Sequence, residues 1–497
     1  MARNILKIGV DMRTKTIVVA GLLALCSSWA GAGEPGGKAG VSAEKQFVLD
    51  WLSRPAVVEA FGRISDTIWH FAELGMQEFK SSALLAHTLE QEGFRVERGL
   101  AGMPTCFVAS YGSGKPVIGI LAEFDALPML SQKGGVPHRE PLVEGAPGHG
   151  CGHNLMGSAA TAAAIAVQRC MEKHNLPGTI KLFGSPAEET LISRPYMIRA
   201  GLFEGVDAVI NNHASSEFST DYGVKGTAVY SVVFVFTGKT AHSGSSPWSG
   251  RSALDAVEIM NVAANYLREH LHFTHRMHYV LLDGGEAPNV VPDRASVWYY
   301  LRNSDDRLED MYRRVVNCAK GAALATGTEL AEVRCLSAIH QSHHNKTLAE
   351  LFQENIELVG MPQWTDEEHA FARALQKGLG RKETGMSSTV AKIKGPEPVF
   401  TGGASSDHGD VTLITPTATI RFPGGVPGAV GHHWSAVAGY YGTGAWKGLN
   451  AGAKAMAASA VDLLTRPDVL RQARDEFTAY SKKNPYKSFL PPDARPP

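Results

Sequence analysis

The sequence predicts an α/β fold, in which a mostly parallel sheet domain carries an inserted ferredoxin-like α+β domain. Two observations support this class. Buried strand-like segments alternate with helical segments in the first half of the chain, which is typical of a parallel α/β sheet. From about residue 227 the order of elements becomes β-α-β-β-α-β, which is the ferredoxin-like arrangement. A small domain therefore interrupts a larger one.

The first part of the larger domain is expected over residues 44–226. Its apolar residues have helical spacing from Ala43 to Gly93, and a long helix is expected over residues 155–173. Short apolar runs that end at polar residues predict three strands, at residues 117–122, 179–183 and 207–211.

The inserted domain is expected over residues 227–344. Its strands are predicted at residues 227–238, 278–285, 294–303 and 329–339, and its helices at 250–271 and 306–327. The larger domain resumes over residues 345–497, with a strand at 415–422 and a helix at 448–464.

Residues 1–32 have the features of a secretory signal peptide. Arg13 and Lys15 precede the apolar run IVVAGLLAL, and Ala30-Gly31-Ala32 forms an A-x-A cleavage sequence. Because the run is short, an N-terminal anchor helix is the weaker alternative. Met12 is an alternative start to Met1. We therefore expect an exported protein, periplasmic or secreted, with no membrane association after processing.

The bulk composition excludes some classes of partner. Lys and Arg number 48 against 49 Asp and Glu, so no excess charge indicates binding to nucleic acid. Five cysteines follow the signal segment. Because an odd number cannot all pair internally, at least one thiol is expected to have another role.

Metal-capable side chains follow the predicted strands. Asp125, the pair Glu188 and Glu189, and His213 each come after a separate strand, while Cys151 and His153 lie in the glycine-rich loop GHGCGHN that opens the next helix. Because the carboxyl ends of parallel strands meet at one edge of the sheet, we expect these groups to lie together. The glycines allow the tight backbone that turns both Cys151 and His153 toward one ion. A structural loop, or half of a disulfide, is the alternative for these two residues.

The chemistry of this set is that of a hydrolytic metal site. Zinc accepts Cys, His and carboxylate ligands together, and a helix N-terminus stabilises a thiolate. Adjacent glutamates allow one to bind metal while the other takes a proton from the attacking water.

Six ordered motifs, from about residue 45 to the C-terminus, resemble those of the dinuclear zinc aminoacylase and peptidase family. They are EFDALPMLSQ, GHGCGHNLMG, SPAEE, GKTAHSG, GGEAPNVVPD and GHHW. The resemblance falls in its amidohydrolase branch, and is greatest to the group of p-aminobenzoyl-glutamate hydrolase B subunits. It implies that the inserted domain serves as a lid and in dimerisation.

The resemblance also implies roles for individual residues. Two divalent ions, Zn or Mn, would be held by Cys151, His153, Glu189, His213 and His432. Glu188 would be the general base, and Asp125 would orient a ligating imidazole. His242 in the lid would polarise the scissile carbonyl, and Asn289 would contact the substrate.

Some residues differ from the family motifs, and others are additional candidates for the same ligand positions. Asn154 stands where the wider branch has Asp, and His149 and His433 are extra histidines beside the ligand candidates. In the loop SSDHGDV, Asp410 is expected to support the site. His343 and His344 are expected to lie in a solvated linker.

These observations predict a metal-dependent amidohydrolase that cleaves N-acyl or N-aroyl amino acids, such as p-aminobenzoyl-glutamate. A metallo-dipeptidase or carboxypeptidase with the same site is the first alternative, and a non-catalytic binding protein is the second. The expected partners are the small-molecule substrate and a second copy of the chain or a homologous subunit.

Overall fold

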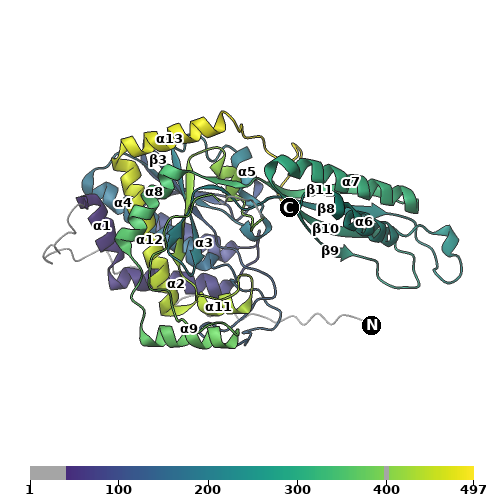
Figure 1. Ribbon diagram of the computed structural model, residues 1–497, viewed down its shortest axis with the longest axis horizontal. Helices are drawn as coiled ribbons and strands as arrows, with labels where there is room; N and C mark the ends of the chain where they lie inside the picture. Colours follow the sequence, from purple (N-terminus) through teal and green to yellow (C-terminus); the bar gives the residue numbers. More distant parts are fainter. Residues whose placement is uncertain (1–40, 397–401) are drawn as a thin grey trace. The chain divides into compact units, whose positions relative to one another are not determined.

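The computed structural model describes residues 41–396 and 402–497. Most of the described chain belongs to one compact unit that begins at Glu44. Its larger sheet, which contains the strand labelled β3 in Figure 1, has seven strands in the order β1-β2-β4-β3-β5-β13-β6. Their bounds are β1 Arg95–Arg98, β2 Phe107–Ser113, β3 Val117–Ala122, β4 Gly178–Gly184, β5 Ala208–Ser215, β6 Ser219–Thr220 and β13 Thr417–Pro423.

The centre of this sheet is parallel and its edges are antiparallel. Strand β3 pairs in parallel with β4 and β5, and β5 pairs in parallel with β13. Strands β1, β2 and β6 run antiparallel to their neighbours. The predicted α/β class is confirmed, and the carboxyl ends of four parallel strands meet along one edge of the sheet.

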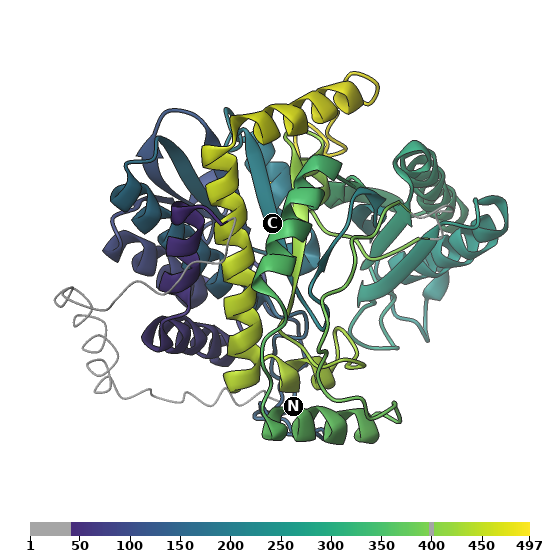
Figure 2. The same ribbon diagram turned by 60° about the vertical axis from the view of Figure 1, so that its left-hand side comes forward.

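Long helices cover one face of the sheet and form its main hydrophobic core. The core helices are α1 Ala43–Leu52, α2 Pro55–Phe71, α3 Phe79–Gln91, α4 His153–His174, α8 Lys346–Val359 and α12 Gly442–Thr465. Alanines fill the buried side of α4, from Ala159 to Ala166, so that α4 packs closely between the sheet and α12. Figure 2 shows α12 and α8 side by side along their length.

The opposite face of the sheet packs against α5 Ser193–Arg199 and shares a core with the inserted domain. Side chains alternate along β3, since Ile118 and Ile120 enter the first core and Leu121 enters the second. The larger domain also contains β7 Gly223–Lys225, β12 Ser342–His344, α9 Asp366–Gly378, α10 His408–Thr412, α11 Trp434–Gly439 and α13 Pro467–Ser481.

The second sheet has four antiparallel strands in the order β11-β8-β10-β9. Its elements follow the predicted β-α-β-β-α-β order. They are β8 Ala228–Thr237, α6 Ala253–Leu267, β9 Arg276–Asp283, β10 Arg294–Asn303, α7 Asp305–Thr326 and β11 Glu329–Ile339. Strand β9 is at the sheet edge, and Tyr279 to Leu282 on it are exposed. The predicted domain boundaries at 227 and 344 stay predictions.

Three details differ from the sequence-based expectation. Strand β5 extends to Ser215, so His213 lies within the strand instead of after it. Helix α12 begins at Gly442, before the expected residue 448, and a further helix, α13, follows it. The expected signal segment, residues 1–32, lies outside the described residues. No helix in residues 41–396 or 402–497 is both long and apolar enough to cross a bilayer.

Candidate metal centre

The glycine-rich loop before α4 places Cys151 against β5. Gly152 has φ +85°, and a Cβ on it would lie 2.7 Å from Cβ of Ala214, so only glycine fits here without strain. The Cys151 Sγ atom lies 3.4 Å from Nε2 of His213. All five cysteines in the described chain are free, so Cys151 is not half of a disulfide.

His153 begins α4 and is completely buried among carboxylates. Its Nδ1 lies 2.8 Å from Oδ1 of Asp125. Its Nε2 lies 3.2 Å from Oε2 of Glu123 and 3.7 Å from Oε2 of Glu188. Within the described chain this Nε2 has no hydrogen-bond partner. A buried ring nitrogen that faces carboxylates without a hydrogen bond suits a metal ligand.

Glu188 and Glu189 begin a short 3-10 helix, Glu188–Thr190. The residues on either side, Ala187 and Leu191, have left-handed backbones with φ of 54° and 61°. Such backbones are costly for residues other than glycine and are concentrated at functional sites. The second carboxylate oxygen of Asp125 accepts a hydrogen bond from the Glu189 backbone N–H at 2.9 Å. Asp125 therefore positions both His153 and Glu189.

His213 and His432 complete the set of imidazoles. Nδ1 of His213 lies 2.7 Å from the backbone oxygen of Ala214, so this nitrogen donates and Nε2 is left facing Cys151. His432 has φ +55°, and its backbone N–H donates to the oxygen of Gly150 at 3.1 Å. Its Nε2 lies 3.4 Å from Oε2 of Glu189.

Three groups of side chains among the described residues could each hold an ion. They are Cys151 with His153 and His213, Cys151 with Glu189 and His432, and Glu123 with His153 and Glu188. In each group the ligand atoms lie within 4.8 Å of one another. All five ligands expected from the sequence fall in the first two groups, which share Cys151. The donors fit two borderline divalent ions held side by side.

The electrostatics of the site also fit bound cations. Burial raises the pKa of Glu189 to about 8, with Asp125 and Glu123 adding to the rise. Burial and the Glu123 carboxylate raise the pKa of Glu188 well above its usual range. Burial lowers the pKa of His213 to about 3, so this imidazole is neutral, as a ligand must be. The buried carboxylates repel one another, and bound positive ions would offset this repulsion.

The Cys151 thiol is protonated when no cation is bound. Burial raises the pKa of this thiol to about 12, and the Glu189 charge adds to the rise. Ligation by Cys151 therefore requires an ion that displaces the thiol proton, and the predicted stabilisation of the thiolate by the helix N-terminus stays a prediction.

A buried ion-pair network behind the site was missed from the sequence. Arg194 donates to Glu123 at 2.7 Å and also pairs with Asp407, and all three side chains are buried. We expected Asp410 to support the site, but its carboxylate accepts hydrogen bonds from the His340 backbone N–H and the Tyr486 hydroxyl. Asp407 is therefore the member of this loop that connects to the metal groups.

The residues that competed with the predicted ligands have other partners. Nε2 of His149 lies 3.1 Å from the backbone oxygen of Ile68. His433 caps α11, since its Nδ1 accepts from the Ser435 backbone N–H and lies 2.9 Å from the Ser435 hydroxyl. Asn154 donates to Ser65 and to the oxygen of Tyr440. None of these three belongs to the candidate metal groups of the described chain.

His242 and Asn289 lie together in the inserted domain. Nδ1 of His242 accepts from the backbone N–H groups of Gly244 and Ser245, and Ser243 donates to the backbone oxygen of Asn289 at 3.1 Å. Both side chains are exposed. Neither is among the described residues that line the cavity over the metal groups. Within one chain, the two residues predicted to contact the substrate therefore do not line the cavity over the metal groups.

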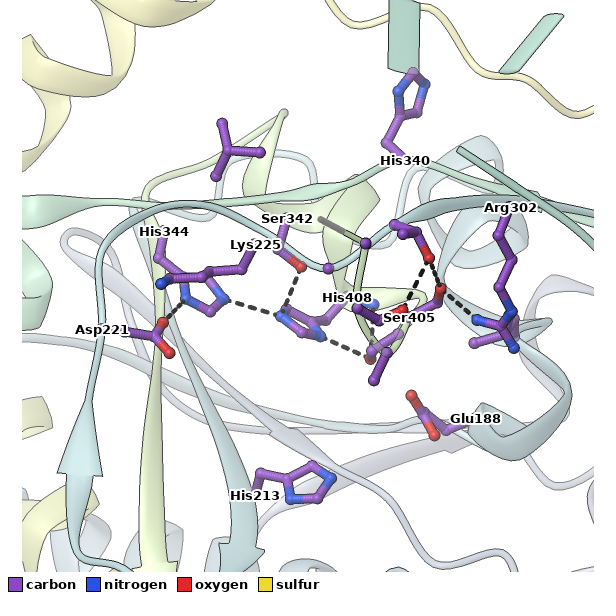
Figure 3. A pocket seen from close by; sticks show the side chains of 18 of the residues that line it. Glu188, His213, Asp221, Lys225, Arg302, His340, Ser342, His344, Ser405 and His408 are labelled. Carbon is purple, nitrogen blue, oxygen red and sulfur yellow. Dashed lines mark hydrogen bonds and ion pairs between the residues drawn. The ribbon is translucent and has the colours of Figure 1, made fainter. Parts of the chain in front are cut away.

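A cavity of about 860 Å³ opens over Cys151, Glu188, Glu189, His213 and His432. Its far wall holds a hydrogen-bonded chain in which Asp221 meets Nδ1 of His344, and Nε2 of His344 lies 3.1 Å from Nε2 of His408 (Figure 3). The expectation of a solvated linker at His344 is therefore wrong, because this side chain is 1% exposed. The sequence drew attention to the loop SSDHGDV only for Asp410, so the role of His408 in this chain was missed.

The site is that of a metallohydrolase. Its candidate metal ligands gather at the carboxyl edge of the parallel strands, and a further carboxylate, Glu188, lies beside them. The sequence profile of peptidase family M20/M25/M40 matches residues 119–418. The chain belongs to this family.

Individual relatives agree with this assignment. The chain is 35% identical over 460 residues to the B-type subunit of p-aminobenzoyl-glutamate hydrolase from Escherichia coli (strain K12), covering 87% of this chain and 95% of the relative. It is 28% identical to the Xaa-Arg dipeptidase of Mus musculus, over 84% and 89% of the two chains. Its fold is similar to that of a Bacillus subtilis protein described as a dinuclear metal binding peptidase from the M20 family, with a TM-score of 0.51, 18% identity, and coverage of 83% and 99%.

Proposed function

We propose that the protein is a metal-dependent amidohydrolase that removes an acyl or aroyl group from an amino acid, as in p-aminobenzoyl-glutamate. The observation that carries this proposal is the clustering of Cys151, His153, Glu189, His213 and His432 in two groups beside Glu188. The Escherichia coli relative, which is named as part of a p-aminobenzoyl-glutamate hydrolase, supports the same class of substrate.

We assign two divalent ions, Zn or Mn, to the two groups that share Cys151. When bound, the ions polarise the scissile carbonyl and make water acidic enough to attack at neutral pH. Asp125 fixes the His153 ring through Nδ1 and so directs Nε2 into the site.

Glu188 is the proposed general base. Its carboxylate faces His153 at the edge of the ligand groups and lines the cavity, so it can meet the attacking water. It takes a proton from this water and then gives the proton to the leaving amine. The buried, strained segment from Ala187 to Leu191 holds it in place, and the Glu78 carboxylate accepts the Ala187 backbone N–H at 2.8 Å.

A dipeptidase is the second candidate, supported by the relative named Xaa-Arg dipeptidase. The cavity weighs against a leaving arginine. Lys225, Arg302 and Arg421 line it, and a cationic side chain would meet like charges there. A non-catalytic binding protein is disfavoured because Glu188 and every expected ligand are present.

We propose that the inserted domain pairs two subunits, either two copies of this chain or this chain with a homologous subunit. The edge strand β9 exposes Val280 and Leu282, and helix α6 of the same domain exposes Val262 and Tyr266. An apolar strand edge of this kind is suited to pairing with a second edge. In such an assembly His242 and Asn289 of one subunit would act at the site of the other.

We also propose that the protein is exported, on the basis of the apolar run and A-x-A sequence in residues 1–32. Expression of the full chain with a C-terminal tag tests this proposal. A shortened, mature N-terminus in the extracytoplasmic fraction supports export, and an intact Met1 or Met12 N-terminus in the cytoplasmic fraction contradicts it.

A substrate panel tests the enzymatic proposal. The metal-depleted protein is reconstituted with Zn²⁺ or Mn²⁺ and given N-acyl amino acids, p-aminobenzoyl-glutamate and unblocked dipeptides. Hydrolysis of the N-blocked substrates supports the amidohydrolase, and hydrolysis of free dipeptides alone favours the dipeptidase.

A further inference from the structure

Residues 486–495, which we call the C-terminal segment, bind along the junction between the larger domain and the inserted domain. Helix α5 of the larger domain holds one part of the segment. The Arg199 guanidinium donates to three of its backbone oxygens, at 2.8, 2.9 and 3.2 Å, and the Tyr196 hydroxyl donates to the backbone oxygen of Arg495 at 3.0 Å. Because these donors satisfy successive carbonyls of an irregular segment, they fix the course of its backbone.

Another part of the C-terminal segment contacts the inserted domain. The Phe489 ring lies against the Tyr230 ring of β8, with centroids 5.8 Å apart, and the backbone oxygen of Phe489 accepts from the Tyr230 hydroxyl at 3.2 Å. Phe489 also stacks on the His340 ring, with centroids 3.8 Å apart, and Nε2 of His340 lies 2.9 Å from the backbone oxygen of Lys487. Leu490 is buried in the core that the larger sheet shares with the inserted domain. The segment therefore binds both domains.

The chain crosses between the two domains at Gly226 and again at His340 and Gln341. The crossings are joined, since Nε2 of Gln341 donates to the backbone oxygen of Gly226 at 3.0 Å. Asp410 of the larger domain accepts from the His340 backbone N–H at 2.9 Å and, with its other carboxylate oxygen, from the Tyr486 hydroxyl at 2.8 Å. The C-terminal segment thus adds a noncovalent connection at the point where the inserted domain joins the larger one.

Tyr230 relates this connection to the cavity over the metal groups. In the sheet register Tyr230 on β8 is the partner of Leu301 on β10. The residues on either side of Leu301 are Tyr300 and Arg302, and both line the cavity. Because the two strands are hydrogen-bonded to each other, a displacement of Tyr230 also moves Tyr300 and Arg302 relative to Glu188 in the larger domain.

We propose that the C-terminal segment is a positioning element, which acts through Phe489 and Tyr230 to set the place of strand β10 over the metal groups. Its effect on the reaction is indirect, since none of residues 486–495 is among the described residues that line the cavity. The three candidate metal groups of the described chain contain no residue of the inserted domain, so metal binding does not depend on this placement. The inference rests on the proposed amidohydrolase function for its turnover measurement alone.

The test uses the full chain carrying Phe489→Ala, which removes the ring that contacts Tyr230 and His340. Turnover is measured with the best N-acyl amino acid of the substrate panel, and metal content is measured on the same preparation. We expect both ions to stay bound and kcat/KM to fall by about 10- to 100-fold, with kcat and KM both changed, because a misplacement of about 1 Å has effects on this scale. Phe489→Tyr retains the ring and should retain most of the activity.

Hydrogen exchange gives a second measurement that needs no turnover. In Phe489→Ala the backbone amides of the crossings, residues 226–230 and 336–342, should exchange faster than in wild type, while those of α4 should be unchanged. Tyr486→Phe removes the hydrogen bond to Asp410 and should change both measurements in the same direction by a smaller amount. If Phe489→Ala does not fold, Tyr486→Phe and Arg199→Met provide the same test.

Two controls distinguish positioning from a general loss of stability. Val469→Ala shortens a buried side chain of α13 in the main core, so it should lower Tm without changing kcat/KM or exchange at the crossings. Asp493→Ala alters an exposed side chain of the C-terminal segment and should leave all of these measurements unchanged.

The outcomes separate this inference from the proposed function. Wild-type kcat/KM in Phe489→Ala would overturn the positioning role, and so would faster exchange throughout the protein instead of at the crossings. A wild-type protein that hydrolyses no N-blocked substrate would overturn the proposed function. Hydrogen exchange would then still decide whether the C-terminal segment holds the inserted domain in place.

Discussion

Asp125 binds His153 through one carboxylate oxygen, at 2.8 Å from Nδ1, and holds the Glu189 backbone N–H with the other. A single side chain thus orients members of both ligand groups that share Cys151. Burial by itself would raise the pKa of Asp125, but the contact with His153 outweighs burial and lowers this pKa, so Asp125 stays ionised in its role.

Asp125→Asn should weaken metal binding by about 10- to 100-fold, the range for loss of a carboxylate behind a ligating histidine. Competition with a chelator of known affinity measures this change. Asp255→Asn, at the exposed first turn of α6, is the control and should leave affinity unchanged. Equal affinity in Asp125→Asn and wild type would contradict the role of Asp125.

Glu188→Gln should retain both ions and lose roughly 100-fold or more in kcat, the scale for removing a general base. Glu189→Gln provides the contrast, because it should lose metal as well as activity. Metal content and turnover are measured on the same preparations. A metal-loaded Glu188→Gln enzyme with near-normal kcat would place the base elsewhere.

Metal affinity should rise with pH. Burial raises the pKa of Cys151 to about 12 and that of Glu189 to about 8, so at pH 6 both groups hold protons that an ion must displace. Each displaced proton makes apparent affinity about tenfold stronger per pH unit. Calorimetry between pH 6 and pH 8, in buffers of different ionisation enthalpy, measures affinity and proton release.

Cys151→Ser should weaken binding and release fewer protons, whereas Cys106→Ser, at a buried thiol outside the ligand groups, should change neither. An affinity that is independent of pH would contradict ligation by the Cys151 thiolate.

His242 is expected to act across the proposed subunit interface, because it is not among the residues that line the cavity of its own chain. His242→Ala and Glu188→Gln should each be inactive as pure oligomers. Co-expressed with different tags and purified as a mixed species, they should regain activity, since one site would then be complete. A mixed dimer no more active than its parents would exclude sharing, and an active monomer would remove its premise.

The features of the fold that depend on local sequence patterns were predicted from the sequence. Strand β3 matches the predicted bounds, and the β-α-β-β-α-β order of the second sheet follows from apolar periodicity alone. Cys151, His153, the glutamate pair and His213 followed from residue type and from their position at strand and helix ends, whereas His432 was assigned only through the family resemblance. In these respects each residue's neighbours in sequence carried enough information.

Long-range contacts were not predictable in the same way. Arg194 joins Glu123 and Asp407, which lie 71 and 213 residues away along the chain, and no local pattern relates them. The contact of His344 with Asp221 spans 123 residues, which is why this histidine was assigned to a linker. Burial, which raises the Cys151 pKa, likewise depends on packing that only the folded chain provides.

The central claim is that two ions at Cys151, His153, Glu189, His213 and His432 enable hydrolysis of an N-acyl amino acid. The most direct measurement is turnover of p-aminobenzoyl-glutamate by metal-depleted protein during titration with Zn²⁺ or Mn²⁺. The account predicts no turnover without metal and a rise that saturates at two ions per chain, with His432→Ala saturating at fewer. Turnover that persists after metal removal, or an inactive protein with two ions bound, would contradict it.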